Sequence, residues 1–91
     1  MAKVIITFKI MPEDVDTNLD ELAKKAELEI KQFGGQVGKI EKEPVGFGLV
    51  ALKMIFVMDE SLGGTDDLEE NISKIAGIQS CSVTDCRRAI G

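Results

Sequence analysis

The chain has 91 residues, with 11 Lys or Arg and 16 Asp or Glu, so its formal net charge is −5. It contains no His and two Cys, which excludes Ser-His-Asp catalysis, a His-ligated metal and a four-Cys zinc site. The acidic balance argues against a nucleic-acid-binding face, and no apolar run approaches the ~20 residues of a membrane span. We therefore expect one domain over residues 1–91, located in the cytoplasm, without cofactor or metal and binding neither nucleic acid nor membrane.

The first half of the chain predicts a strand, a helix and a second strand. Residues 3–11 alternate apolar and polar side chains, and Pro12 ends the run. A helix should follow with Thr17 or Asn18 as its N-cap and Gly34 as its C-cap. Its core stripe comprises Leu19, Leu22, Ala23, Ala26, Ile30 and Phe33. Residues 36–43 predict a weaker strand whose charges suit a sheet edge.

The second half predicts a strand, a helix and a last strand. Residues 44–48 read as a connection, and residues 49–58 are the most apolar segment, typical of a central strand buried on much of both faces. After a loop over 59–64, Thr65 should cap a second helix that Gly77 ends. The inner stripe of that helix is Leu68, Ile72, Ile75 and Ala76. A final strand is predicted from residue 78 to about 86, followed by a terminal tip.

The order strand-helix-strand-strand-helix-strand is that of the split βαβ, or ferredoxin-like, arrangement. This is an α+β fold in which a four-stranded antiparallel sheet carries both helices on one face. Because the fold hosts many unrelated functions, it does not by itself indicate what the chain does.

Phe47 is the most informative residue of the predicted connection. Gly46-Phe47-Gly48 with Ala51 fits G-x-G-x-x-A, but a dinucleotide fingerprint must follow a strand and open a helix, whereas here a strand is predicted to follow. The glycines therefore permit a tight bend instead. Phe47 is then either a side chain that packs in the core or an apolar knob presented to a partner, and both interpretations stay open.

The two cysteines, the acidic start of the second helix and the two arginines of the terminal tip are each considered as a functional site. Cys81 and Cys86 lie five apart on one predicted strand, so they should point to opposite faces ~16 Å apart and cannot pair. Four carboxylates complement the dipole at the start of the second helix and lack the spacing of a metal loop: Asp66, Asp67, Glu69 and Glu70. Arg87 and Arg88 are either solvated charges or cations that reach into another protein's anionic or metal-binding pocket.

Several segments together resemble the nucleotide-exchange domain of translation elongation factor 1-beta, in its stand-alone archaeal form. Residues 44–48 are similar to the P-[IV]-G-[FY]-G element of that family, and residues 78–80 begin a segment similar to its closing strand. Residues 12–19 and 65–69 are similar to the starts of its two helices. The likeness runs along essentially the whole chain, in order and with nearly constant spacing.

The resemblance implies a guanine-nucleotide exchange factor, without covalent chemistry, that binds the GTPase elongation factor 1-alpha and speeds GDP release. Phe47, held between Gly46 and Gly48, stands where the family has an aromatic that wedges against the nucleotide domain of the GTPase. Arg88 stands where the family usually has a Lys that disturbs the magnesium and switch region. Arg is planar and bulkier than Lys, and Arg87 takes this role if the register slips by one. We expect a monomer when the protein is free.

Two other classes of function are compatible with a ferredoxin-like fold. A small-molecule-sensing regulatory domain would form dimers through its sheet edges and would need a ligand pocket, often at the subunit interface. An RNA-binding domain would need exposed aromatic residues on the sheet and a basic face, and the sequence supplies neither.

Overall fold

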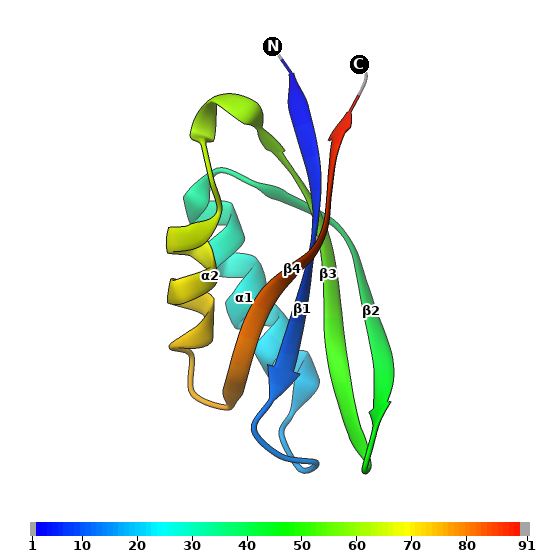
Figure 1. The fold of residues 1–91 in the computed structure, drawn as a ribbon. Coiled ribbons are helices and arrows are strands. Elements are labelled where there is room, and N and C mark those ends of the chain that lie inside the picture. Colours follow the sequence, from blue (N-terminus) through cyan, green and yellow to red (C-terminus); the bar gives the residue numbers. More distant parts are fainter. Residues whose placement is uncertain (1, 90–91) are drawn as a thin grey trace.

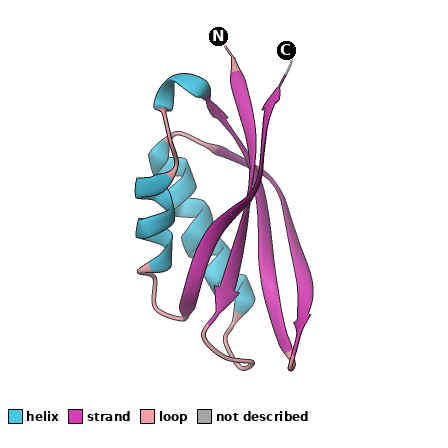
Figure 2. Cartoon of the chain, viewed as in Figure 1, coloured by secondary structure: helices cyan, strands magenta, loops and turns pink. Residues whose placement is uncertain are grey.

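The computed structural model describes residues 2–89 and has two layers, a sheet and a pair of helices that cover one of its faces (Figures 1 and 2). The elements are β1 (Lys3–Pro12), α1 (Leu19–Phe33), β2 (Gln36–Gly46), β3 (Leu49–Asp59), the 3₁₀ turn η1 (Glu60–Leu62), α2 (Asp66–Ser73) and β4 (Ile78–Ala89). The four strands lie in the order β2-β3-β1-β4, and every neighbouring pair is antiparallel. The predicted ferredoxin-like α+β fold is confirmed.

The core lies between the sheet and the helices. Phe8 on β1 and Phe56 on β3 are fully buried and meet edge to face, with ring centroids 4.9 Å apart. Burial of one such ring stabilises the fold by roughly 1.5–3 kcal/mol. The prediction that β3 is buried on much of both faces is only half right, because burial alternates from Leu52 onward. No helix among residues 2–89 covers the other face of the sheet, where Lys53, Ile55 and Val57 are half-exposed.

Local capping fixes the ends of α1. The side chain of Asn18 accepts a hydrogen bond from the backbone N–H of Glu21 (3.2 Å), so Asn18 rather than Thr17 is the N-cap. Gly34 has φ +109° and its N–H donates to the carbonyls of Ile30 and Lys31, as predicted for the C-cap.

The second helix is shorter than its apolar periodicity predicts. It ends at Ser73, whose hydroxyl donates to the carbonyl of Glu70 (2.8 Å). Ile75 and Ala76 therefore lie in the turn that precedes Gly77, not on the helix. Thr65 occupies the N-cap position, but its hydroxyl donates to the carboxylate of Glu69 (3.4 Å) and caps no backbone N–H.

The connection predicted over residues 44–48 is mostly strand. The ladder between β2 and β3 pairs Pro44 with Val50 and Gly46 with Leu49, so Val45 is an extra residue in a bulge. Pro44 is tolerated because β2 is an edge strand. The turn between the two strands is reduced to Phe47 and Gly48.

A second bulge changes the orientation of β4. The pairing with β1 passes from Phe8↔Val83 to Thr7↔Asp85, which leaves Thr84 unpaired in the ladder. Its hydroxyl instead donates to the carbonyl of Thr7 (3.4 Å).

The bulge places both cysteines on the helix side of the sheet. Cys81 lies opposite Ile10 and Cys86 lies opposite Ile6, two residues that share the buried face. The prediction that the cysteines point to opposite faces is therefore wrong, although both thiols are free. Burial, with a smaller contribution from the charge of Glu69, raises the pKa of the Cys81 thiol to about 12.

The last strand is longer than predicted. Instead of ending near residue 86 it continues to Ala89, because Lys3 and Val4 at the start of β1 remain available as ladder partners for Ala89 and Arg88. Arg87 and Arg88 are therefore held in the sheet and do not lie in a loose tip. The two residues that follow, Ile90 and Gly91, lie outside the described part of the chain.

Candidate partner-binding residues at the two ends of the sheet

Phe47 forms the tip of the β2–β3 hairpin and makes almost no contact with the rest of the protein. Its exposed fraction is 101%, so the side chain is a knob and not a core residue. Phe47 has φ +54° and Gly48 has φ +77°, the positive values at both central positions that a type I′ turn requires. Gly46, at φ +104°, begins this run of left-handed backbone. The flanking glycines thus make the turn possible, and the turn projects the phenyl ring into solvent.

The loop between β1 and α1 lies beside this hairpin tip, at the lower end of Figure 1. Residues of both segments, among them Val15 and Gly48, line a small hollow of about 40 Å³. Val15 is itself exposed over 58% of its surface. Val15 is not among the residues predicted from the sequence, although a single branched apolar residue among the carboxylates of a short loop is a visible signal.

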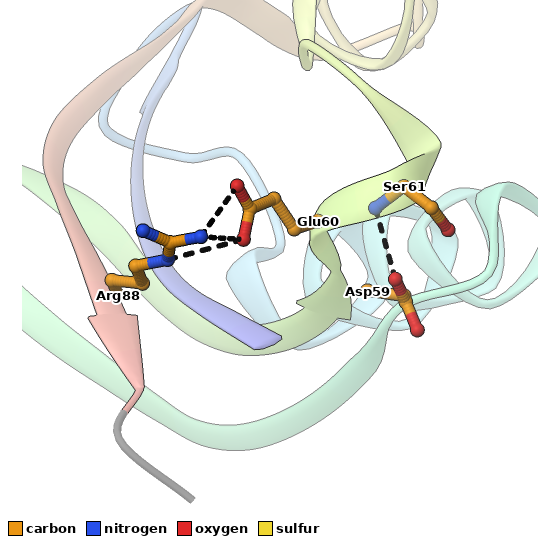
Figure 3. A network of polar contacts seen from close by, with 4 residues as sticks. All are labelled: Asp59, Glu60, Ser61 and Arg88. Atoms are coloured by element: carbon orange, nitrogen blue, oxygen red, sulfur yellow. Dashed lines mark hydrogen bonds and ion pairs between the residues drawn. The ribbon is translucent and has the colours of Figure 1, made fainter. Parts of the chain in front are cut away.

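Arg88 lies near the end of β4 and binds Glu60 (Figure 3). Its Nε donates to one carboxylate oxygen of Glu60 at 3.1 Å, and its Nη2 donates to both oxygens at 3.0 and 2.8 Å. Both side chains are largely exposed, so we expect this pair to be worth at most ~1 kcal/mol despite its geometry. Arg88 also borders a shallow hollow of about 420 Å³ together with Ala2 and residues 59–61.

The position of Glu60 is fixed by its neighbours. The carboxylate of Asp59 accepts a hydrogen bond from the N–H of Ser61 (2.9 Å) and caps η1 (Figure 3). Hydrogen bonding from Ser61 lowers the pKa of Asp59 below its usual value. The N–H of Glu60 donates to the carbonyl of Ala2 (3.0 Å), which ties η1 to the start of the chain. The pairing of Glu60 with Arg88 could not be predicted from the sequence, because it depends on the register of β4.

Arg87 faces the opposite side of the sheet from Arg88. It pairs across the ladder with Ile5, whereas Arg88 pairs with Val4, which packs against the core. Its Nε lies 2.9 Å from a carboxylate oxygen of Asp85. Successive residues of a strand point to opposite faces, so only Arg88 of this pair lies on the side of η1 and the hollow.

The predicted site residues form two groups at opposite ends of the sheet. Phe47 lies two residues before Leu49, at one end of β3, while Arg88 pairs with Val4, which pairs with Met58 at the other end. Nine residues of strand separate the two groups by ~30 Å, in a molecule whose longest extent is 41 Å. The structure places Phe47, Gly46 and Gly48 in one turn. At the other end it places Arg87 and Arg88 on opposite faces of the sheet, and it does not bring the two groups into one pocket.

Comparison with known proteins identifies the family. A family model described as the EF-1 guanine nucleotide exchange domain matches residues 5–89, which include both groups. The chain is 42% identical over 88 residues to elongation factor 1-beta of Methanothermobacter thermautotrophicus, covering 97% of this chain and 98% of the relative. The protein belongs to the EF-1 guanine nucleotide exchange family. Two further members are the elongation factor 1-beta proteins of Methanobrevibacter smithii and Methanococcoides burtonii, which are 43% and 40% identical and are covered over 98% and 100% of their length.

Among solved structures, the de novo designed protein Foldit4 is similar in fold. It has a TM-score of 0.61 and 18% sequence identity, with 98% of each chain covered, and it therefore supports the architecture alone.

As a member of the EF-1 guanine nucleotide exchange family, this chain is a translation elongation exchange factor of archaeal type, and its partner is a GTPase. No helix among residues 2–89 is long and apolar enough to cross a membrane.

Proposed function

We propose that this chain promotes the release of GDP from elongation factor 1-alpha so that GTP can rebind during translation elongation. The observation that carries the proposal is the match of residues 5–89 to an exchange domain. It favours nucleotide exchange over a small-molecule-sensing regulatory domain. We further propose that the unit that acts is the single domain over residues 1–91, working in the cytoplasm and monomeric when free.

Exchange of this kind needs no bond chemistry from the chain. A GTPase holds GDP through Mg²⁺ coordination and through the loop that surrounds the phosphates. A cation placed beside those groups competes electrostatically with Mg²⁺ and weakens nucleotide binding. The factor needs only to bind the nucleotide-loosened state of the GTPase more tightly than the loaded state, and each ~1.4 kcal/mol of that preference shifts the equilibrium tenfold.

Arg88 is the proposed cation. It lies on the side of η1, beside the open hollow, and its Nη1 takes no part in the hydrogen bonds to Glu60. Because the exposed pair with Glu60 is worth at most ~1 kcal/mol, Arg88 can exchange that carboxylate for an anionic group of the GTPase at little cost. Arg87, on the other face and paired with Asp85, is the less suitable candidate.

Phe47 is the proposed anchor at the other end. An exposed aromatic ring on a tight turn offers a large apolar area with little conformational entropy to lose on binding, which is typical of interface hot spots. Since it lies ~30 Å from Arg88 along the sheet, Phe47 acts through affinity and orientation and not on the nucleotide itself.

The proposal is tested by release of fluorescently labelled GDP from elongation factor 1-alpha of the same organism, with this chain in catalytic amounts. We expect the native chain to accelerate release, Arg88→Ala to abolish most of the acceleration, and Arg87→Ala to retain it. Arg87→Ala is the matched control because it removes the same charge one residue away. No acceleration by the native chain would refute the proposed function. Equal losses in both variants would refute the assignment to Arg88.

A further inference from the structure

The open face of the sheet, on the side away from α1 and α2, carries apolar side chains that the core does not use (Figures 1 and 2). Ile5 on β1 and Ile55 and Val57 on β3 are half-exposed there. Ile5 lies directly opposite Val57 in the ladder between the two central strands, and Ile55 lies opposite Thr7. We call Ile5, Ile55 and Val57 the apolar strip.

Lys9 lies next to the apolar strip on β1 and has another cation as its neighbour. In the ladder it lies directly opposite Lys53, and like charges at opposite positions of an antiparallel pair destabilise a sheet. On its other side, β4 offers the uncharged Ser82. Within residues 2–89 Lys9 forms no ion pair, whereas the Nζ of Lys53 lies 3.8 Å from a carboxylate oxygen of Glu43. The half-buried Lys9 is therefore a cation in the middle of the sheet that the fold does not compensate.

The charges at the two edges of the open face are compensated within the face. On β2 the Nζ of Lys39 lies 2.8 Å from a carboxylate oxygen of Glu41. On β4 the Nε of Arg87 lies 2.9 Å from a carboxylate oxygen of Asp85. A partner that covers this face thus meets the apolar strip and the free charge of Lys9 between two neutral borders. The surface that complements it carries a carboxylate beside apolar side chains.

The charge and the length of the open face indicate which partner covers it. Two copies of this chain packed face to face about a two-fold axis would bring Lys9 and Lys53 of one copy against those of the other, which is unfavourable. A GTPase that contacts both Phe47 and Arg88 must instead extend along the molecule, because ~30 Å of sheet separates them. The strands β1 and β3 connect these two ends, so Lys9 and the apolar strip lie between the two proposed contacts.

We propose that Lys9 and the apolar strip form a third contact surface for the GTPase partner, and that the surface they receive carries a carboxylate beside an apolar side chain. The inference rests on the proposed function and deepens it, since it adds a contact between the two ends and states the chemistry of the partner's surface. It also gives a physical reason for a lysine opposite a lysine, because a residue that is unfavourable in the free protein becomes favourable in the complex.

The test is a titration of GDP release against the concentration of the chain. We expect Lys9→Gln to raise the half-saturating concentration about fivefold and Lys9→Glu about tenfold or more, with the maximal rate unchanged because Arg88 is untouched. Lys25→Gln is the matched control, since it removes the same charge from the exposed side of α1 and Lys25 forms no ion pair within residues 2–89. It should leave both parameters unchanged.

Thermal unfolding separates a lost contact from a damaged fold. Lys9→Glu should raise the midpoint by roughly 2–4 °C, because opposite charges then face each other across β1 and β3. A variant that is more stable than the native chain and yet binds the GTPase more weakly has lost a contact and not its fold.

Cross-linking tests the carboxylate directly. A water-soluble carbodiimide joins a lysine amine to a carboxylate in contact with it, so it should link Lys9 to an Asp or Glu of the GTPase in the complex, as identified by mass spectrometry. A complex that is cross-linked through other lysines but not through Lys9 would overturn the inference. Val57→Thr keeps the branched shape and removes one methyl group of the apolar strip, and it should raise the half-saturating concentration about twofold.

Distinct outcomes overturn the inference and the proposed function. If the native chain accelerates release and the Lys9 variants act like it, the third contact is wrong while the function stands. Equal losses with Lys9→Gln and Lys25→Gln would assign the effect to overall charge and would also overturn the inference. If sedimentation shows a native dimer whose dissociation changes with Lys9→Glu but not with Lys25→Gln, the face joins two copies and the proposed occupant is wrong. A native chain that neither binds nor acts on the GTPase overturns both.

Discussion

Replacing Phe47 with Asn should stabilise the protein and impair its binding. An L-residue other than Gly, Asn or Asp in the left-handed region costs roughly 1–2 kcal/mol, and Phe47 occupies that region at φ +54°. Asn is the residue that type I′ turns prefer immediately before Gly, and Gly48 is already in place. The phenyl ring is fully exposed, so its removal sacrifices no burial. We therefore expect a net gain of about 1 kcal/mol in the free energy of unfolding.

Urea denaturation measures this gain directly, as a higher midpoint with an unchanged slope. In thermal unfolding, about 1 kcal/mol corresponds to a rise of roughly 4–8 °C for a domain of this size. Phe47→Ala is the control, since it also removes the ring but keeps a Cβ atom at positive φ, and its stability should stay near that of the native chain. Both variants should bind the GTPase more weakly. A Phe47→Asn protein that is no more stable than native would refute the argument from backbone strain.

Three further predictions concern single side chains. Glu60→Gln removes the counter-charge of Arg88. It should lower the free energy of unfolding by less than ~1 kcal/mol and raise the exchange rate at low salt by up to about fivefold. Slower exchange would show that Glu60 positions Arg88 and does not restrain it. In the folded state the pKa of the Cys81 thiol is about 12, against a usual value of 9.0. The shift therefore stabilises the folded state fully below pH 9, and this stabilisation is lost as the pH rises toward 12. Cys81→Ala should flatten the decline of stability over that interval, and at pH 8 a thiol reagent should modify the exposed Cys86 far faster than Cys81.

Periodicity and caps were enough to predict the fold, because each signal is local. The alternation in residues 3–11, the stripe that ends at Gly34 and the apolar run after Gly48 each depend on neighbours within one element. The errors occur where partners distant in the sequence decide the outcome. The extension of β4 to Ala89 requires the free ladder positions on β1, and the bulge at Thr84 exists only in relation to Thr7.

The candidate residues could be named from the sequence, but their arrangement in space could not. The turn glycines and Phe47 stand out in sequence, yet exposure of the ring follows from the two-residue turn, which depends on the register of β2 against β3. Likewise, no local pattern connects Arg88 with Glu60, which lies 28 positions earlier and meets it only across the sheet.

The bulge at Thr84 decides which of two adjacent arginines faces Glu60. If Thr84 instead paired with Thr7 in a regular ladder, every later residue of β4 would shift by one position along β1, and Arg87 would take the place opposite Val4 that Arg88 holds. Whether Arg87 or Arg88 is the cation is therefore a question of strand register and not of residue type. A chain that lacked Thr84 would keep Arg88 in position, while one extra residue between Cys86 and Arg87 would move Arg87 into its place.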